Sequence, residues 1–109
     1  MYDTTKEITL EGVITQFQFV NPHPFVTVSV ETRNDDKQQW RMELDNRSEL
    51  TEIGVNSATL KPGDRVVVIG SPGRSQAQIL YIRRLDRPAD GLRYEQIGAS
   101  PHIQFPAKR

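Results

Sequence analysis

The sequence contains no cysteine, so disulfide bonds, zinc–thiolate sites and thiol nucleophiles are all excluded. No apolar run approaches the length of a membrane-spanning helix or of a signal-peptide core. A net charge is also lacking, because 14 basic residues offset 14 acidic ones. General polyanion binders usually carry a basic excess, so this balance disfavours nucleic acid as a partner.

Catalytic constellations are missing as well. The glycine-containing segment 70–74 lacks the lysine and the spacing of a phosphate-binding loop, and the serines have no predicted histidine partner. We therefore predict that the protein is not an enzyme and that it uses no cofactor.

With 109 residues the chain is long enough for one domain with a single core, which buries roughly 60–65% of the unfolded surface. We place an OB-like β-barrel domain at 1–87. Residues 88–109 hold three prolines and show no sustained period, which predicts an extended C-terminal tail.

The first strand is predicted within 6–20, where apolar residues alternate with polar ones but change parity partway. Ile8, Leu10 and Ile14 fall on even positions, whereas Val13, Phe17 and Phe19 fall on odd ones. A one-residue slip at 12–15 would reconcile the two sets, which is what a β-bulge at a glycine does.

Further strands follow at 25–31 and 39–45, separated by a polar turn at 33–37. The period then changes to that of a helix at 46–54, with Asn46 as its cap and Gly54 at its stop. Two more strands are predicted after the Pro-Gly turn within 60–70 and at 78–85. The order predicts an all-β fold with one short helix, namely a five-stranded OB-like Greek-key barrel with the helix between strands three and four.

A stiff corner joins the first two strands, because Asn21-Pro22 and His23-Pro24 are consecutive X-Pro steps. An imidazole on such a loop can contact a ligand or a metal ion, so Asn21 and His23 are candidate site residues, and His23 is a speculative metal ligand. The alternative is structural, with Asn21 closing the turn and His23 packing there.

Trp40 is the third candidate, because OB-folds use the sheet face of their second and third strands for stacking. Trp40 also shares its parity with Met42 and Leu44, which equally favours core packing. Arg74 is the fourth candidate. Together with Arg83 and Arg84 it would serve a single-stranded nucleic-acid groove.

Several of these motifs resemble a domain family of unknown function found in small exported proteins of Gram-negative bacteria. The resemblance rests on the Asn-Pro-His triplet from Asn21, on Trp40, on the Leu-Lys-Pro-Gly-Asp run at 60–64 and on the opening segment at 2–12. Such proteins typically carry a signal peptide and a short His-containing segment ahead of the matching part. The resemblance therefore implies a periplasmic location and an unassigned activity.

The sequence thus favours a small non-enzymatic periplasmic binding or accessory module of unknown ligand. Its expected partner is a small ligand or a protein, with no membrane span and a monomeric or weakly dimeric state. Two alternatives stay open: a single-stranded nucleic-acid-binding OB module, and a periplasmic protein that binds copper or zinc through His23.

Overall fold

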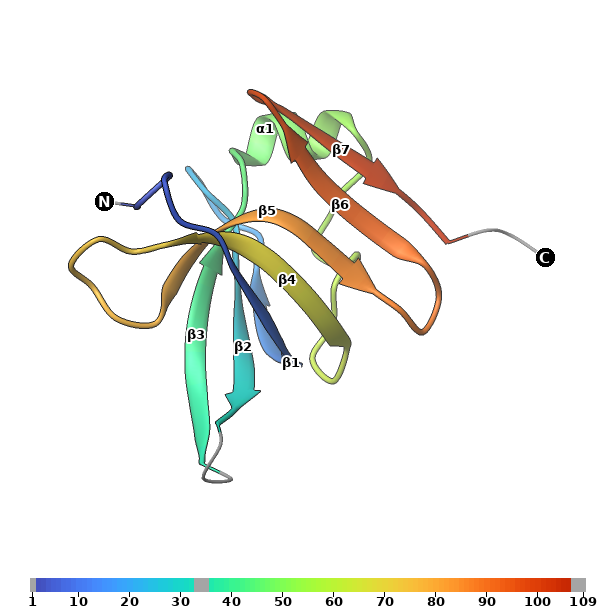
Figure 1. Cartoon of the computed structure of the whole chain (residues 1–109). Helices are drawn as coiled ribbons and strands as arrows, with labels where there is room; N and C mark the ends of the chain where they lie inside the picture. Colours follow the sequence, from blue (N-terminus) through green and yellow to red (C-terminus); the bar gives the residue numbers. More distant parts are fainter. Residues whose placement is uncertain (1, 33–35, 107–109) are drawn as a thin grey trace.

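The computed structural model describes residues 2–32 and 36–106, which form one seven-stranded sheet and one short helix (Figure 1). The predicted order of three strands, a helix and two strands is confirmed, and two further strands follow it. The elements are β1 (Ile8–Gln18), β2 (Phe25–Glu31), β3 (Lys37–Glu43), α1 (Arg47–Glu52), β4 (Arg65–Pro72), β5 (Ile79–Arg87), β6 (Leu92–Ile97) and β7 (Ser100–Gln104).

Five of the strands close into a barrel. β3 and β5 pair in parallel through 41–43 and 79–81, and the other neighbouring strands pair antiparallel. The order around the barrel is β1–β2–β3–β5–β4 and back to β1. This is an OB-like closed barrel, and the predicted fold class is confirmed.

The bend in β1 lies where the change of parity predicts it. Ile14 pairs with Val28 and Gln16 pairs with Thr27, so the intervening Thr15 is the extra residue of a β-bulge. The bulge lets one strand pair with β2 along its second half and with β4 along its first half.

The core fills the barrel with side chains that alternate along the strands. Val26 and Val28 of β2 and Met42 of β3 are fully buried, and α1 contributes Leu50, which has no exposed surface. The helix has the predicted cap at Asn46, whose Oδ1 accepts a hydrogen bond from the Glu49 backbone N–H at 2.9 Å.

Within the predicted tail at 88–109, residues 92–104 form two strands instead, β6 and β7. β6 pairs with β5 and β7 pairs with β6, so this segment adds a hairpin to the barrel. Leu92 and Tyr94 on β6 are buried in the main core. The prolines were misleading, because Pro101 lies on the outermost strand, where a missing N–H need not break a ladder bond.

The predicted turn at 33–37 falls partly outside the described residues, since 33–35 are not among them. The flanking residues are paired as a hairpin requires, because Glu31 lies opposite Lys37 and the Thr32 N–H donates to the Asp36 carbonyl at 2.7 Å.

Candidate functional site

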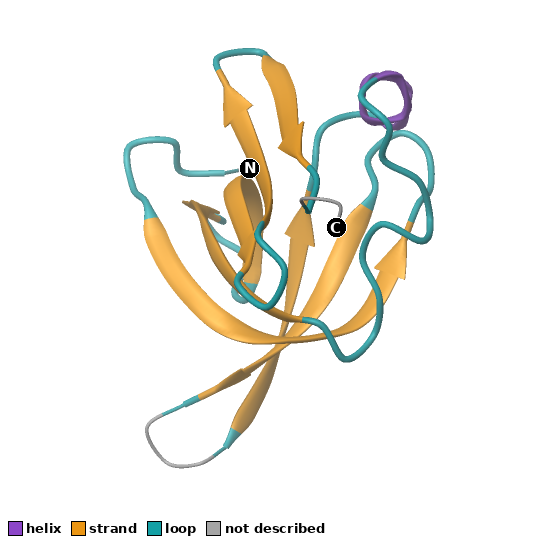
Figure 2. Cartoon of the chain, turned by 90° about the vertical axis from the view of Figure 1, so that its right-hand side faces the viewer, coloured by secondary structure: helices purple, strands orange, loops and turns teal. Residues whose placement is uncertain are grey.

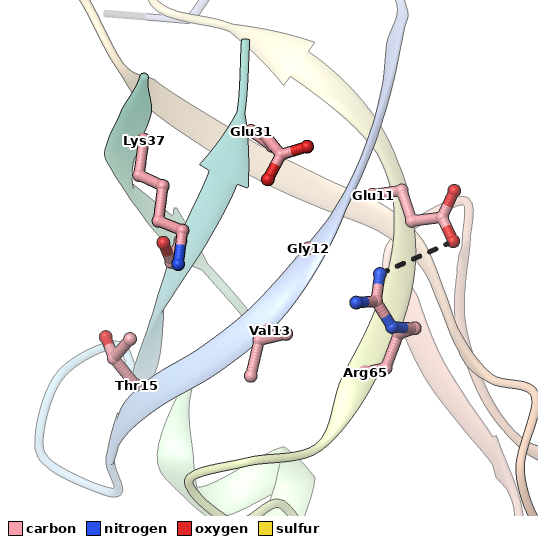
Figure 3. A pocket seen from close by; sticks show the side chains of 8 residues that line it. Glu11, Gly12, Val13, Thr15, Glu31, Lys37 and Arg65 are labelled. Carbon is pink, nitrogen blue, oxygen red and sulfur yellow. Dashed lines mark ion pairs between the residues drawn. The ribbon is translucent and has the colours of Figure 1, made fainter. Parts of the chain in front are cut away.

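The outer surface of β1, β2 and β3 carries a shallow depression with a volume of about 370 Å³ (Figure 3). Alternation along the strands directs the valines of β2 inward and its hydroxyl side chains outward. We call this surface the β1–β3 face and define it by its outward residues, which are Val13, Thr15, Thr27, Ser29, Glu31, Lys37, Gln39 and Arg41.

The bend of β1 shapes this depression. Gly12 lies between β2 and β4, opposite Val30 and Val66, and is buried. A Cβ atom on Gly12 would stand 2.2 Å from the Ser29 carbonyl oxygen, so a side chain does not fit at this position. The glycine therefore permits the close approach of β1 to β2 beneath the face.

The bulge residue Thr15 links the three strands of the face. Its Oγ1 donates toward the Thr27 carbonyl of β2 at 3.2 Å and lies 3.3 Å from Gln39 Oε1 of β3. Because a bulge re-aims its side chain, Thr15 stands over the face instead of alternating with its neighbours. The centre of the face is therefore built from hydroxyl and amide groups.

Charged side chains of both signs border the depression (Figure 3). Glu11 and Arg65 form an ion pair at 3.8 Å, and their side chains are 61% and 64% exposed. Glu31 and Lys37 occupy opposite positions on β2 and β3. Exposed pairs of this kind add little to stability, so these four groups are available to a ligand at small energetic cost.

An arginine packs over an aromatic ring at the other end of the face. The Arg41 guanidinium carbon lies 3.6 Å from the centroid of the Phe25 ring. Phe25 begins β2 and is half-buried, whereas Arg41 is exposed. Such cation–π packing orients the guanidinium and leaves its donors pointing to solvent.

The predicted corner lies beside the helix and away from the depression. His23 Nδ1 lies 3.2 Å from the Leu44 carbonyl oxygen, where a protonated nitrogen donates. The Arg47 N–H donates to the Pro22 carbonyl at 3.2 Å. These contacts attach the β1–β2 loop to the start of α1, while Asn21 is exposed at its tip.

Trp40 and Arg74 lie elsewhere. Trp40 faces the interior with Met42, is half-buried and packs against the core, and its Nε1 donates to Gln38 Oε1 at 3.3 Å. Arg74 follows β4, and its Nε donates to the Tyr2 carbonyl at 3.2 Å. Leu44, the contact of His23, follows the end of β3 and is four residues from Trp40, about 13 Å at 3.3 Å per residue. The four predicted residues are therefore not gathered into one site.

Sequence reasoning missed the residues that line the depression, Thr15 and Ser29 above all. A signal was present, because hydroxyl residues alternate with valines in the second strand. The polar half of that alternation becomes a candidate surface once the barrel shows that β1, β2 and β3 are neighbours.

The three tyrosines meet acidic groups where β3 ends. Tyr2 donates to Glu43, and its ring centroid lies 5.8 Å from that of Tyr81. Burial, and next the hydrogen bond to Glu43, raise the pKa of Tyr2. Burial, followed by the charge of Asp45, raises the pKa of Tyr81, and burial raises that of Tyr94. All three phenols stay protonated at neutral pH, and those of Tyr2 and Tyr94 donate hydrogen bonds.

Asp45 ties the C-terminal hairpin to the helix. Its Oδ1 accepts from the Asn46 backbone N–H at 2.7 Å, and its Oδ2 accepts from Gln96 Nε2 at 2.7 Å. Tyr94 donates to Gln96 Oε1 at 2.9 Å. This satisfied network is structural, because each polar group in it has a partner within the chain.

The arginines proposed for a nucleic-acid groove also have partners within the chain. Arg83 Nε donates to Ser71 Oγ at 3.0 Å, and Arg84 Nε donates to Asp86 at 2.9 Å. Among residues 2–32 and 36–106, no group of three histidine, aspartate or glutamate side chains could hold a metal ion, and no helix is long and apolar enough to cross a membrane.

The closed barrel with its polar outer face defines an OB-like β-barrel domain with an added hairpin. The chain belongs to a family of unknown function (DUF6152), whose model matches residues 1–80. The predicted resemblance to a family of unknown function is thereby confirmed. The match ends within β5, ahead of the hairpin. No curated protein matches the chain.

Proposed function

We propose that the protein is a small non-enzymatic binding module that holds a polar ligand on the β1–β3 face. The observation that carries this proposal is the depression between Glu11–Arg65 and Glu31–Lys37, which is lined by the hydroxyls of Thr15 and Ser29. The outer surface of the second and third strands is where OB-folds commonly bind their ligands.

The chemistry of the face favours an extended, hydrogen-bonding ligand. Pockets for small molecules are mostly apolar and enclose most of the ligand, whereas this depression is shallow and polar. Hydroxyl and amide groups at its centre can both donate and accept. Arg41, oriented by Phe25, adds a planar set of donors at one end. A glycan chain satisfies these groups best, since it offers hydroxyls along its length.

We further propose a periplasmic location, which the resemblance to small exported proteins supports. Fractionation of cells that express the natural gene with its own N-terminus would test it. Recovery of the protein with a periplasmic marker after osmotic shock is expected, and recovery with a cytoplasmic marker would exclude this location.

The two alternatives receive less support. Single-stranded nucleic acid would need free cations, but Arg74, Arg83 and Arg84 are each hydrogen-bonded within the chain. Copper or zinc binding through His23 would need further ligands, and the contact of His23 with the Leu44 carbonyl serves the loop. The binding experiment includes one probe for each alternative.

The binding experiment is a titration followed by backbone amide resonances in NMR. The probes are a soluble hexasaccharide of N-acetylglucosamine, a thymidine dodecamer, and zinc chloride. We expect the hexasaccharide to shift the amide resonances of Thr27, Ser29 and Gln39. Shifts confined to the 21–24 loop with zinc, or a salt-sensitive response to the oligonucleotide alone, would favour an alternative function.

A blocking variant makes the experiment specific to the face. Ser29→Arg places a long side chain in the depression and should abolish the hexasaccharide-induced shifts. Gln104→Arg adds the same side chain to an exposed position on β7 and should leave them unchanged. Equal binding by both variants would exclude the β1–β3 face as the glycan site.

A further inference from the structure

A second surface lies between α1 and the start of β7. A groove there has a volume of about 480 Å³ and is lined by Glu49, Glu52 and Ile53 from the helix and Ala99, Ser100 and Pro101 from the hairpin. β7 is the strand closest to α1, and in Figure 2 the purple helix stands on the side of β7 away from β6. The groove therefore follows the free edge of the sheet.

The backbone of β7 has unused hydrogen-bonding groups along that edge. The two-residue turn 98–99 makes Ile97 and Ser100 a bonded pair, so Ser100, His102 and Gln104 point their backbone groups toward β6. Pro101 and Ile103 point theirs outward. Within the described residues, the Pro101 carbonyl and the Ile103 N–H and carbonyl have no backbone partner.

Proline limits what can pair with this edge. Pro101 has no N–H, so an added antiparallel strand would make three hydrogen bonds here, two with Ile103 and one with the Pro101 carbonyl. A longer added strand would find no backbone N–H donor at Pro101. The missing donor also disfavours uncontrolled pairing of this edge with the edge strands of other molecules. The edge therefore suits a short extended segment.

The side chains of the groove define the chemistry of that segment. Both charged lining residues, Glu49 and Glu52, are acidic, and the lining contains no cation. Glu52 is exposed, and no hydrogen bond or ion pair engages its side chain within the described residues. Ile53 is half-buried and Pro101 is buried, which provides an apolar floor. Charge complementarity thus calls for a basic side chain beside an apolar one.

We propose that this groove binds an extended peptide of a partner protein, which adds to the free edge of β7 and places a lysine or arginine against Glu49 and Glu52. Strand addition takes affinity from main-chain hydrogen bonds and specificity from side-chain pockets. This surface is separate from the β1–β3 face, so it can operate whether or not that face binds a ligand.

The test uses two capped pentapeptides, Val-Lys-Val-Lys-Val and Val-Glu-Val-Glu-Val, titrated into the full chain and followed by NMR. The basic peptide should shift the amide resonances of Ser100 and Ile103, and the acidic peptide should bind at least tenfold more weakly. Methylating the central backbone nitrogen of the basic peptide should also weaken binding, because it removes one main-chain donor.

Charge variants test the role of the helix. Glu52→Gln should weaken the basic peptide roughly two- to fivefold, the range for a single exposed ion pair. Glu7→Gln removes the same charge from an exposed residue ahead of β1 and should have no effect. Equal binding of both peptides, shifts away from β7, or absence of binding would overturn the proposal. Concentration-dependent shifts at Ile103 without peptide would overturn it too, because a second copy would then occupy the edge.

Discussion

Asp86 shows how one carboxylate can hold two arginines on the surface of the barrel. Its carboxylate accepts from Arg84 at 2.9 Å and from Arg93 at 2.8 Å. Burial by itself would raise the pKa of Asp86, but the hydrogen bonds from Arg93 and Arg84 outweigh it and hold the pKa below its usual 3.8. Because the folded pKa is depressed, this carboxylate stabilises the fold above the unfolded pKa.

That stabilisation should disappear in acid. As the pH falls from about 5 through 3.8 to the folded pKa, the contribution of Asp86 to the free energy of unfolding should be lost. The partner arginines are more than a third exposed, so we expect Asp86→Asn to cost only about 0.5–1 kcal/mol at pH 7 and progressively less as the pH falls below 3.8. Urea unfolding of both proteins at pH 7, 4 and 2 measures this, and a difference in stability that does not shrink as the pH falls would contradict it.

Arg87, the last residue of β5, forms a second group of hydrogen bonds beside Asp86. It donates to the Thr59 carbonyl at 2.9 Å and to Asp64 at 2.8 Å, and it forms a two-point pair with Asp90. Hydrogen bonding from Arg87 lowers the pKa of Asp90. The arginine thus joins the loop before β4 to the turn between β5 and β6.

At the scale of elements, two strands depend on a glycine at which another strand comes close. A Cβ atom on Gly12 of β1 would stand 2.2 Å from the Ser29 carbonyl oxygen, and one on Gly70 of β4 would stand 2.2 Å from the Tyr81 carbonyl oxygen. Both obstacles are backbone atoms of a paired strand, which cannot move aside without disturbing the ladder.

Gly12→Ala should therefore destabilise the protein by about 3 kcal/mol, at the upper end for overpacking. Gly63→Ala provides the comparison, because nothing lies within 4 Å of the added Cβ and only the φ of +94° opposes it. That strain should cost about 1–2 kcal/mol. Chemical denaturation ranks the two variants, and an equal or larger loss for Gly63→Ala would show that β1 tolerates a side chain at its bend.

At the scale of the whole molecule, the added hairpin completes the core of the barrel, although the family match ends before it. Leu92 and Tyr94 of β6 are 2% exposed and belong to the same core as the barrel strands. The Gln96 side chain donates a hydrogen bond to Asp45. Asp45 also accepts one from the backbone N–H of Asn46, the cap residue of α1. The hairpin therefore shields both the core and the junction of β3 with α1.

A chain that ends at Pro88 should be strongly destabilised. It would lose the burial of Leu92 and Tyr94, about 1.5–3 kcal/mol each, from a total stability of about 5–15 kcal/mol. Tyr94→Phe should lose only about 1 kcal/mol, because the ring stays and the hydroxyl hydrogen bonds go. Thermal unfolding followed by circular dichroism compares the truncated chain and Tyr94→Phe with the full chain. A truncated chain as stable as the full one would show that the hairpin is dispensable.

Local patterns of the sequence determined most of the barrel. Alternation, β-branched and apolar runs and turn residues placed β1 to β5, a change of parity located the bulge within 12–15, and the Asn46 cap located α1. Each of these signals is contained within a few consecutive residues. The hairpin was missed because Pro101 and the shortness of the two strands hide the alternation of Leu92 and Tyr94.

The surfaces were decided by the tertiary structure alone. The β1–β3 face needs three strands side by side, and the groove needs α1 against β7, although about 50 residues separate them. From the sequence alone, His23 is a candidate site residue. In the fold, its Nδ1 lies beside the backbone carbonyl of Leu44, which is 21 positions away. A sequence pattern reports which side of an element is apolar, whereas a binding surface depends on which elements meet, and closure of the barrel decides that.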